Sequence, residues 1–190
     1  MTIAEQIKNI TSSLPTTTRL IAVSKTKPVE DIQEAYNAGQ RVFGENKALE
    51  MRDKHEALPK DIEWHFIGHL QTNKIKYIIP YVSLIHSIDS LNLLKEVNKE
   101  ATKKGRKVDC LLQFHIAQED TKFGLSYEEA EQLLSSTEYK QMENIRIVGV
   151  MGMATFTDNN TQVSAEFGSL RTIFDRLKKE YFSTEESFCE

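Results

Sequence analysis

Short apolar runs alternate along this chain with longer stretches in which apolar residues recur every three or four positions. Runs of the first kind are typical of buried strands, and stretches of the second kind are typical of amphipathic helices. The alternation therefore predicts a βα repeat built on a parallel sheet. The predicted strands cover residues 20–24, 41–44, 63–68, 82–87, 108–116 and 146–151, with a short seventh strand at 188–190.

Start and stop signals mark the helices between these strands. Pro28 and Gly39 bracket one helical stretch, because proline is favoured in the first turn of a helix and glycine after the last. Ser126 and Glu129 form a capping box that opens another helix. Apolar stripes at helical spacing run from Ile3 to Leu14, from Val29 to Tyr36, from Leu91 to Ala101 and from Val163 to Tyr181. The first of these predicts an extra helix ahead of the sheet.

The predicted strands begin at intervals of roughly 20 residues, without the break rich in Gly, Ser or Pro that separates domains. We therefore expect residues 1–190 to form a single domain. Seven strands with helices between them fit either a (β/α)8 barrel that lacks its last unit or an open doubly wound sheet, and the periodicity does not choose between these. The sequence has neither GxGxxG nor GxxxxGK[ST], which weakens the nucleotide-binding form of the open sheet.

The composition narrows the function classes. The 190 residues are 39% hydrophobic, enough for a core without metal or disulfide, and Cys110 and Cys189 form no CxxC pair. The formal net charge is −4 and no basic block occurs, which argues against a nucleic-acid partner. We find neither an apolar run as long as a membrane span nor a secretory leader. These features predict a cytoplasmic protein that does not bind membranes.

The chemistry of either architecture lies at the carboxyl ends of the strands, where Lys25 follows the first apolar run. Partial desolvation at that point favours the neutral amine, which is the nucleophile that forms a Schiff base with an aldehyde. The alternative is a lysine that only extends from the rim with its charge in water. Lys27 lies two residues further on, so the alternation of side chains along a strand does not distinguish the two lysines.

Other reactive side chains are assigned structural roles. His65 and His69 have the spacing of metal ligands on a helix, but His65 belongs to a strand and Gly68 interrupts the path between them. We therefore expect no metal, and instead histidines that form hydrogen bonds at the rim of the site. Cys110 alternates with Val108 inside a strand and is predicted to lie in the core.

Six motifs occur in order: Ala22-Val23-Ser24-Lys25-Thr26-Lys27-Pro28, Phe43-Gly44-Glu45-Asn46, Trp64 to Lys74 (WHFIGHLQTNK), Ile85-His86-Ser87-Ile88-Asp89, Lys122-Phe123-Gly124 and Gly149-Val150-Met151-Gly152-Met153. Together they resemble the pyridoxal 5'-phosphate (PLP) homeostasis proteins. The resemblance implies a TIM-type barrel like the PLP-binding barrel of alanine racemase, with this vitamin B6 cofactor held as a Schiff base on Lys25 rather than Lys27. It also implies that Asn46 lies beside the cofactor and that His65, His86 and Met151 line the pocket.

The chain departs from the family pattern in two places. Gln113-Phe114-His115-Ile116 stands where the family usually has an asparagine in the fifth strand. Family members also continue past the position of Glu190 through a turn rich in Ser and Gly and an eighth strand, which cradle the cofactor phosphate. We therefore expect the last βα unit and the phosphate-binding residues to lie outside these 190 residues, so that the Schiff base would be the main anchor.

The resemblance implies a protein that stores, delivers or buffers PLP in the cytoplasm without turnover, acting as a monomer with PLP-dependent apoenzymes as its partners. One alternative is an amino-acid racemase or decarboxylase of the same fold. Racemisation needs a second acid or base opposite the lysine, which relatives with that activity supply from an added domain and a partner subunit. The other alternative is an interaction scaffold that binds no cofactor.

Overall fold

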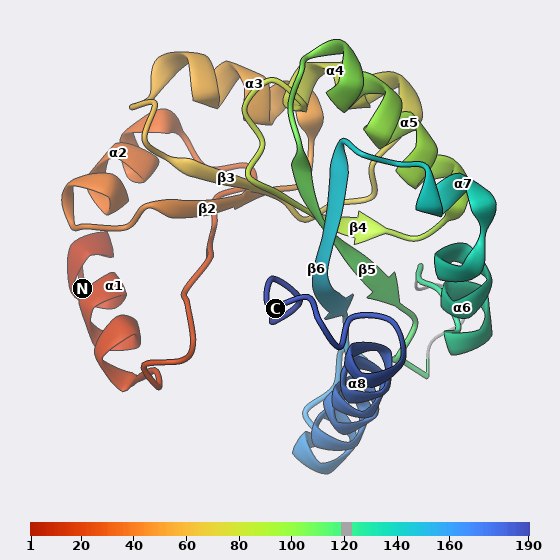
Figure 1. Ribbon diagram of the computed structural model, residues 1–190. Helices are drawn as coiled ribbons and strands as arrows, with labels where there is room; N and C mark the ends of the chain where they lie inside the picture. Colours follow the sequence, from red (N-terminus) through yellow and green to blue (C-terminus); the bar gives the residue numbers. More distant parts are fainter. Residues whose placement is uncertain (119–122) are drawn as a thin grey trace.

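Figure 1 shows the computed structural model, which describes residues 1–118 and 123–190. Its strands form one sheet, in which neighbours along the chain are also neighbours in space and every pair is parallel. The strands are β1 (Ala22–Val23), β2 (Val42–Glu45), β3 (Glu63–Phe66), β4 (Leu84–Ile88), β5 (Val108–Phe114) and β6 (Ile145–Gly152). This sequential order is that of a β/α barrel, and it excludes the doubly wound sheet, in which the strand order reverses.

The helices lie on the outer side of the curved sheet, with α1 ahead of β1 as predicted (Figure 1). They are α1 (Ile3–Ser13), α2 (Val29–Asn37), α3 (Ala48–Ala57), α4 (Ile75–Ile78), α5 (Leu91–Lys103), α6 (Tyr127–Ser135), α7 (Thr137–Lys140) and α8 (Asn160–Glu180), with a 3-10 turn η1 (Thr72–Lys74) before α4. The capping box of Ser126 and Glu129 opens α6 as predicted. In the part of the chain that the structure describes, no helix combines the length and apolar character needed to cross a bilayer.

The two faces of the sheet differ in what covers them. The main core lies between the sheet and the helices, where Phe43, Trp64 and Phe66 are almost completely buried. Cys110 belongs to the same core, as predicted. The inner face carries a second, small apolar cluster of Leu84, Leu111 and Val148, against which Met151 packs. The large apolar core therefore joins the helices to the sheet, and a much smaller apolar cluster lies on the inner face.

The sheet is open between β1 and the last residues. Residues 188–190 were predicted to form a seventh strand, but the structure assigns no strand there. They nevertheless lie beside β6, because Cys189 donates its backbone N–H to the carbonyl of Val148 at 2.9 Å and Val150 donates to the carbonyl of Glu190 at 3.1 Å. The segment thus makes the first bonds of a strand without the length that defines one.

Candidate functional site

The carboxyl ends of the parallel strands meet along one edge of the sheet, which we call the rim. The first polar or sulfur-containing side chains after β1 to β6 are Ser24, Asn46, His69, Asp89, His115 and Met153, and Lys25 directly follows Ser24. In a β/α barrel this edge carries the ligand site, because the strand-to-helix loops supply its side chains. The rim is therefore the candidate site.

Lys25 lies in a tight turn directly after β1. The backbone N–H of Lys27 donates to the carbonyl of Ser24 at 3.0 Å, which closes the turn. The side chain of Lys25 is exposed, so the predicted desolvation of its amine is not found in the described residues. The reason is that β1 is the outermost strand of the open sheet, where even Val23 is 53% exposed. Among the described residues, no group forms a hydrogen bond or ion pair with the Lys25 amine.

A buried lysine on α3 supports this turn. Lys54 is only 5% exposed, and its Nζ donates three hydrogen bonds of 2.7 Å, one for each proton of the ammonium group. The acceptors are the carbonyl of Ser24, Oε1 of Glu45 and Oε1 of Glu50. The hydroxyl of Ser24 also donates to Oε1 of Glu45 at 2.6 Å. One ammonium thus joins the end of β2, the start of α3 and the turn of Lys25.

Two carboxylates form ion pairs with Lys54. Glu45 is fully buried, and its Oε2 has no hydrogen-bond partner among the described residues. Glu50 is only partly buried and accepts the backbone N–H of Thr26 at 2.6 Å. Partial burial raises the pKa of Glu50, but the hydrogen bonds from Lys54 and Thr26 outweigh this and hold the pKa below its usual value. Both carboxylates therefore serve as acceptors for groups around the turn.

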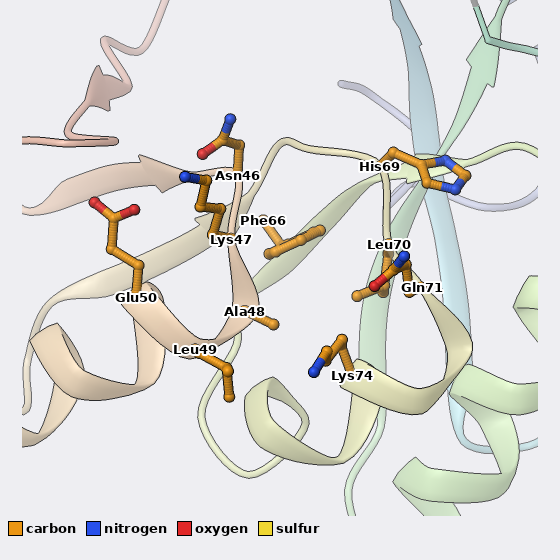
Figure 2. A pocket seen from close by; sticks show the side chains of 10 residues that line it. All are labelled: Asn46, Lys47, Ala48, Leu49, Glu50, Phe66, His69, Leu70, Gln71 and Lys74. Atoms are coloured by element: carbon orange, nitrogen blue, oxygen red, sulfur yellow. The ribbon is translucent and has the colours of Figure 1, made fainter.

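A cavity of about 330 Å³ lies beside this network, between the start of α3 and the loop after β3. Figure 2 shows Lys47 and Glu50 on the α3 side and His69 and Gln71 on the other. The full lining is Asn46, Lys47, Ala48, Leu49, Glu50, Phe66, His69, Leu70, Gln71 and Lys74. Lys25 does not line this cavity. Glu50 connects the cavity with the turn, because it lines the cavity and accepts the backbone N–H of Thr26.

Asn46 lines the cavity, and its backbone packs closely against Gly68 in the loop after β3. A Cβ atom on Gly68 would lie 2.5 Å from the carbonyl oxygen of Asn46 and 2.7 Å from its Cα. The backbones can approach this closely only because residue 68 has no side chain. Oδ1 of Asn46 is buried and has no partner in the described part of the chain. Asn46 therefore offers an acceptor that no neighbouring protein group uses.

Gly68→Ala is expected to displace the backbone of Asn46 and to destabilise the protein by about 1–3 kcal/mol, the usual cost of overpacking. The clash involves backbone atoms, which a change of side-chain rotamer cannot relieve. Urea unfolding measures the effect, with Gly168→Ala as the control, because a Cβ there would meet nothing within 4 Å. Gly168→Ala should keep or raise the stability, because alanine is favoured over glycine inside helix α8. A Gly68→Ala protein as stable as the wild type would contradict the close approach.

His65 and His86 form a buried pair on neighbouring strands. Nδ1 of His65 lies 2.9 Å from Nε2 of His86, so one ring donates the proton and the other accepts it. His65 also lines a second cavity of about 270 Å³, with Glu63, Asp109 and Arg146, near the amino ends of the strands. The histidines were predicted to lie at the rim, but this pair lies inside the sheet, because both residues fall within strands and not after them.

Burial lowers the pKa of His65 to about 3, with a smaller effect from His86, and it lowers the pKa of His86 to about 4. The unfolded chain therefore binds protons below about pH 6.5 that the folded protein does not bind. We expect the free energy of unfolding to fall as the pH falls from 6.5 towards 4, by up to about 1.4 kcal/mol per pH unit for each histidine.

Urea unfolding as a function of pH checks this expectation. The double variant His65→Leu/His86→Leu should lose the histidine part of the slope, whatever its stability at neutral pH. An unchanged slope between pH 6.5 and 4 in the double variant would show that other groups cause the dependence.

His69, rather than His65, lies at the rim. Its Nδ1 is 3.4 Å from Oδ2 of Asp89, and its ring stacks on Phe123 with the ring centroids 4.6 Å apart.

Within residues 1–118 and 123–190, no three or more His, Cys, Asp or Glu side chains are close enough together to hold a metal ion. Of the predicted Lys122-Phe123-Gly124 motif, Lys122 lies outside the described residues.

Met151, the last of the predicted pocket residues, lies on the inner face of β6. It packs against the inner apolar cluster defined above and is paired across the sheet with Gln113 of β5. Gln113 stands where the resemblance leads one to expect an asparagine, and its Nε2 donates to the carbonyl of Phe123 at 3.1 Å. This glutamine therefore holds the loop that carries the stacking partner of His69.

The sequence analysis gave no role to Thr26, which it named only as part of a motif, and did not identify Glu50 and Lys54. Glu50 and Lys54 have the i,i+4 spacing of an ordinary exposed ion pair, and nothing in that spacing indicates burial. One signal was present in the sequence: Lys54 lies three residues after Met51, so both fall on one side of the same helix. The structure buries Met51 completely. A lysine on the apolar face of a helix needs a charged partner, and this requirement could have identified it.

The sequential parallel order of the strands and the polar rim at their carboxyl ends define a protein of the β/α barrel class with an open sheet. The family described as "Alanine racemase, N-terminal domain" matches residues 1–189. The chain is 41% identical over 164 residues to the pyridoxal phosphate homeostasis protein of Aquifex aeolicus, covering 86% of this chain and 71% of that one. It is 35% identical over 162 residues to the protein of the same name from Helicobacter pylori strain J99, covering 84% and 72%. The chain belongs to this family, on the branch of the pyridoxal phosphate homeostasis proteins.

Solved structures agree with this assignment. PipY of Synechococcus elongatus, solved without PLP, superposes with a TM-score of 0.88 at 33% identity, covering 94% of this chain and 83% of that one. The structure of PipY with PLP bound superposes with a TM-score of 0.83 over the same shares. Alanine racemase from E. faecalis is only 16% identical, with a TM-score of 0.72 over 90% of this chain and 48% of that one, and shows a shared fold.

Proposed function

We propose that this protein binds PLP and holds it as a Schiff base on Lys25. The observation that carries the proposal is the position of Lys25, an exposed amine without a protein partner among the described residues, in a braced turn at the end of β1. Two findings on relatives support it: the homologues are named pyridoxal phosphate homeostasis proteins, and PipY has been solved with PLP bound.

The residues of the rim fit this role. Lys25 would hold PLP through its amine, because a neutral amine condenses with the aldehyde that the cofactor supplies and releases the carbonyl oxygen as water. An amine without an ion pair gives up no protein contact when it reacts. Oδ1 of Asn46, which is buried and has no partner in the described part of the chain, is an acceptor that a ligand at the rim could use.

The role that fits best is storage, delivery or buffering of PLP in the cytoplasm, without turnover. Relatives bear the name of a homeostasis function and not of an enzyme, which supports this over racemisation or decarboxylation. We further propose that residues 1–190 act as a single, monomeric domain and that PLP-dependent apoenzymes receive the cofactor.

Reduction of a PLP-treated sample tests the proposal. Added PLP should produce the absorbance band of a protonated Schiff base, and borohydride should remove the band and leave a covalent adduct that mass spectrometry maps to Lys25. A protein that shows no band and no adduct would be the cofactor-free scaffold. Racemisation or decarboxylation across a panel of amino acids would instead establish the enzyme.

A further inference from the structure

The turn that carries Lys25 contains a strained residue. Thr26 has a φ angle of +64°, in the left-handed region that β-branched residues rarely adopt. Such a conformation persists only where the surrounding structure enforces it. The side chain of Lys25 has no partner of its own among the described residues, so the direction of its amine depends on the backbone of this turn. Whatever holds the turn therefore orients the amine.

We propose that Glu50 and Lys54 are positioning residues for Lys25, an inference that rests on the proposed role of Lys25. Neither residue needs to touch the ligand. They hold the backbone on both sides of Lys25, because Lys54 donates to the carbonyl of the preceding residue and Glu50 accepts the N–H of the following residue.

The geometry favours this role over a general contribution to stability. The hydrogen bond from Thr26 to Glu50 is 2.6 Å long and involves an ionised acceptor, which makes it one of the stronger kinds. Oε1 of Glu50 also accepts from Lys54, so the carboxylate is itself held in place. The bond acts on the strained residue directly. If it is lost, Thr26 can relax towards an ordinary backbone conformation and turn Lys25 away from the rim.

A rescue experiment separates positioning from stability. In Glu50→Ala, the apparent PLP affinity, measured from the Schiff-base absorbance, should fall at least about tenfold, the factor that corresponds to ~1.4 kcal/mol. Glycine adopts the left-handed conformation without strain. The double variant Glu50→Ala/Thr26→Gly should therefore return the affinity to near the wild-type value. Glu56→Ala is the matched control, because Glu56 is an exposed glutamate on the same helix.

Each outcome decides a different point. If borohydride traps no adduct on Lys25 in the wild-type protein, the proposed function fails. If the wild type is trapped at Lys25 and Glu50→Ala binds PLP equally well, the positioning role is wrong. Loss in Glu50→Ala without rescue by Thr26→Gly would also overturn it, since the effect would then not pass through the turn. Circular dichroism and urea unfolding confirm that each variant is folded, and Glu50→Leu, which keeps much of the side-chain volume but offers no acceptor to Thr26, replaces Glu50→Ala if that variant is not.

Discussion

Lys25→Ala is expected to abolish the borohydride-trapped adduct of PLP. The Schiff base needs a primary amine, and alanine removes it while leaving the backbone of the turn intact. Lys27→Ala is the matched control, because Lys27 lies two residues away, is also exposed, and donates only its backbone N–H to the turn. Peptide mapping after reduction should therefore find an adduct in Lys27→Ala at the wild-type level and none in Lys25→Ala.

A second variant removes the remaining ambiguity. Lys25→Arg keeps the positive charge but offers a guanidinium, which stays protonated and is not a nucleophile. It should also give no adduct. An adduct that persists in both Lys25 variants and maps to Lys27, Lys47 or Lys74 would show that another lysine forms the Schiff base.

Lys54→Met is expected to lower the free energy of unfolding by about 3–5 kcal/mol, the cost of breaking a buried ion pair by removing one partner. Methionine fills a similar volume but leaves the carboxylate of Glu45 buried without its counter-charge. The carbonyl of Ser24 loses its hydrogen bond to Lys54 as well. Urea unfolding measures the change.

A double variant shows whether the lost charge balance is the cause. In Lys54→Met/Glu45→Gln the buried charge is gone, so much of the stability should return. Lys99→Met is the matched control, since Lys99 pairs with Glu96 on an exposed helix surface and exposed pairs contribute little. If Lys54→Met were as stable as Lys99→Met, the buried pair would have no structural role.

The sequence alone was sufficient for the repeating elements. Apolar alternation predicted the strands observed as β1 to β6 to within about two residues at each end, and it predicted the helix ahead of the sheet. The capping box at Ser126 was also readable, because a cap involves residues only three positions apart. These features depend on local hydrogen bonding and on the period of the side chains, both of which are properties of short stretches.

The strand-end position of Lys25 also followed from the sequence, since a lysine after an apolar run falls at the rim of any parallel sheet. Its exposure did not follow. The sequence analysis expected desolvation, but whether a strand end is covered depends on what lies on the other side of the barrel, and β1 is the edge strand of the open sheet.

Only the tertiary structure decided which polar groups meet. His65 and His86 are 21 residues apart and become a buried hydrogen-bonded pair because β3 and β4 are neighbours in the sheet. Lys54 reaches Ser24, 30 residues earlier, because α3 packs beside the turn after β1. The spacing of apolar residues is a property of each segment, so it can be recognised in the sequence. The partner of a buried charge depends on how separate segments pack, and no single segment carries that information.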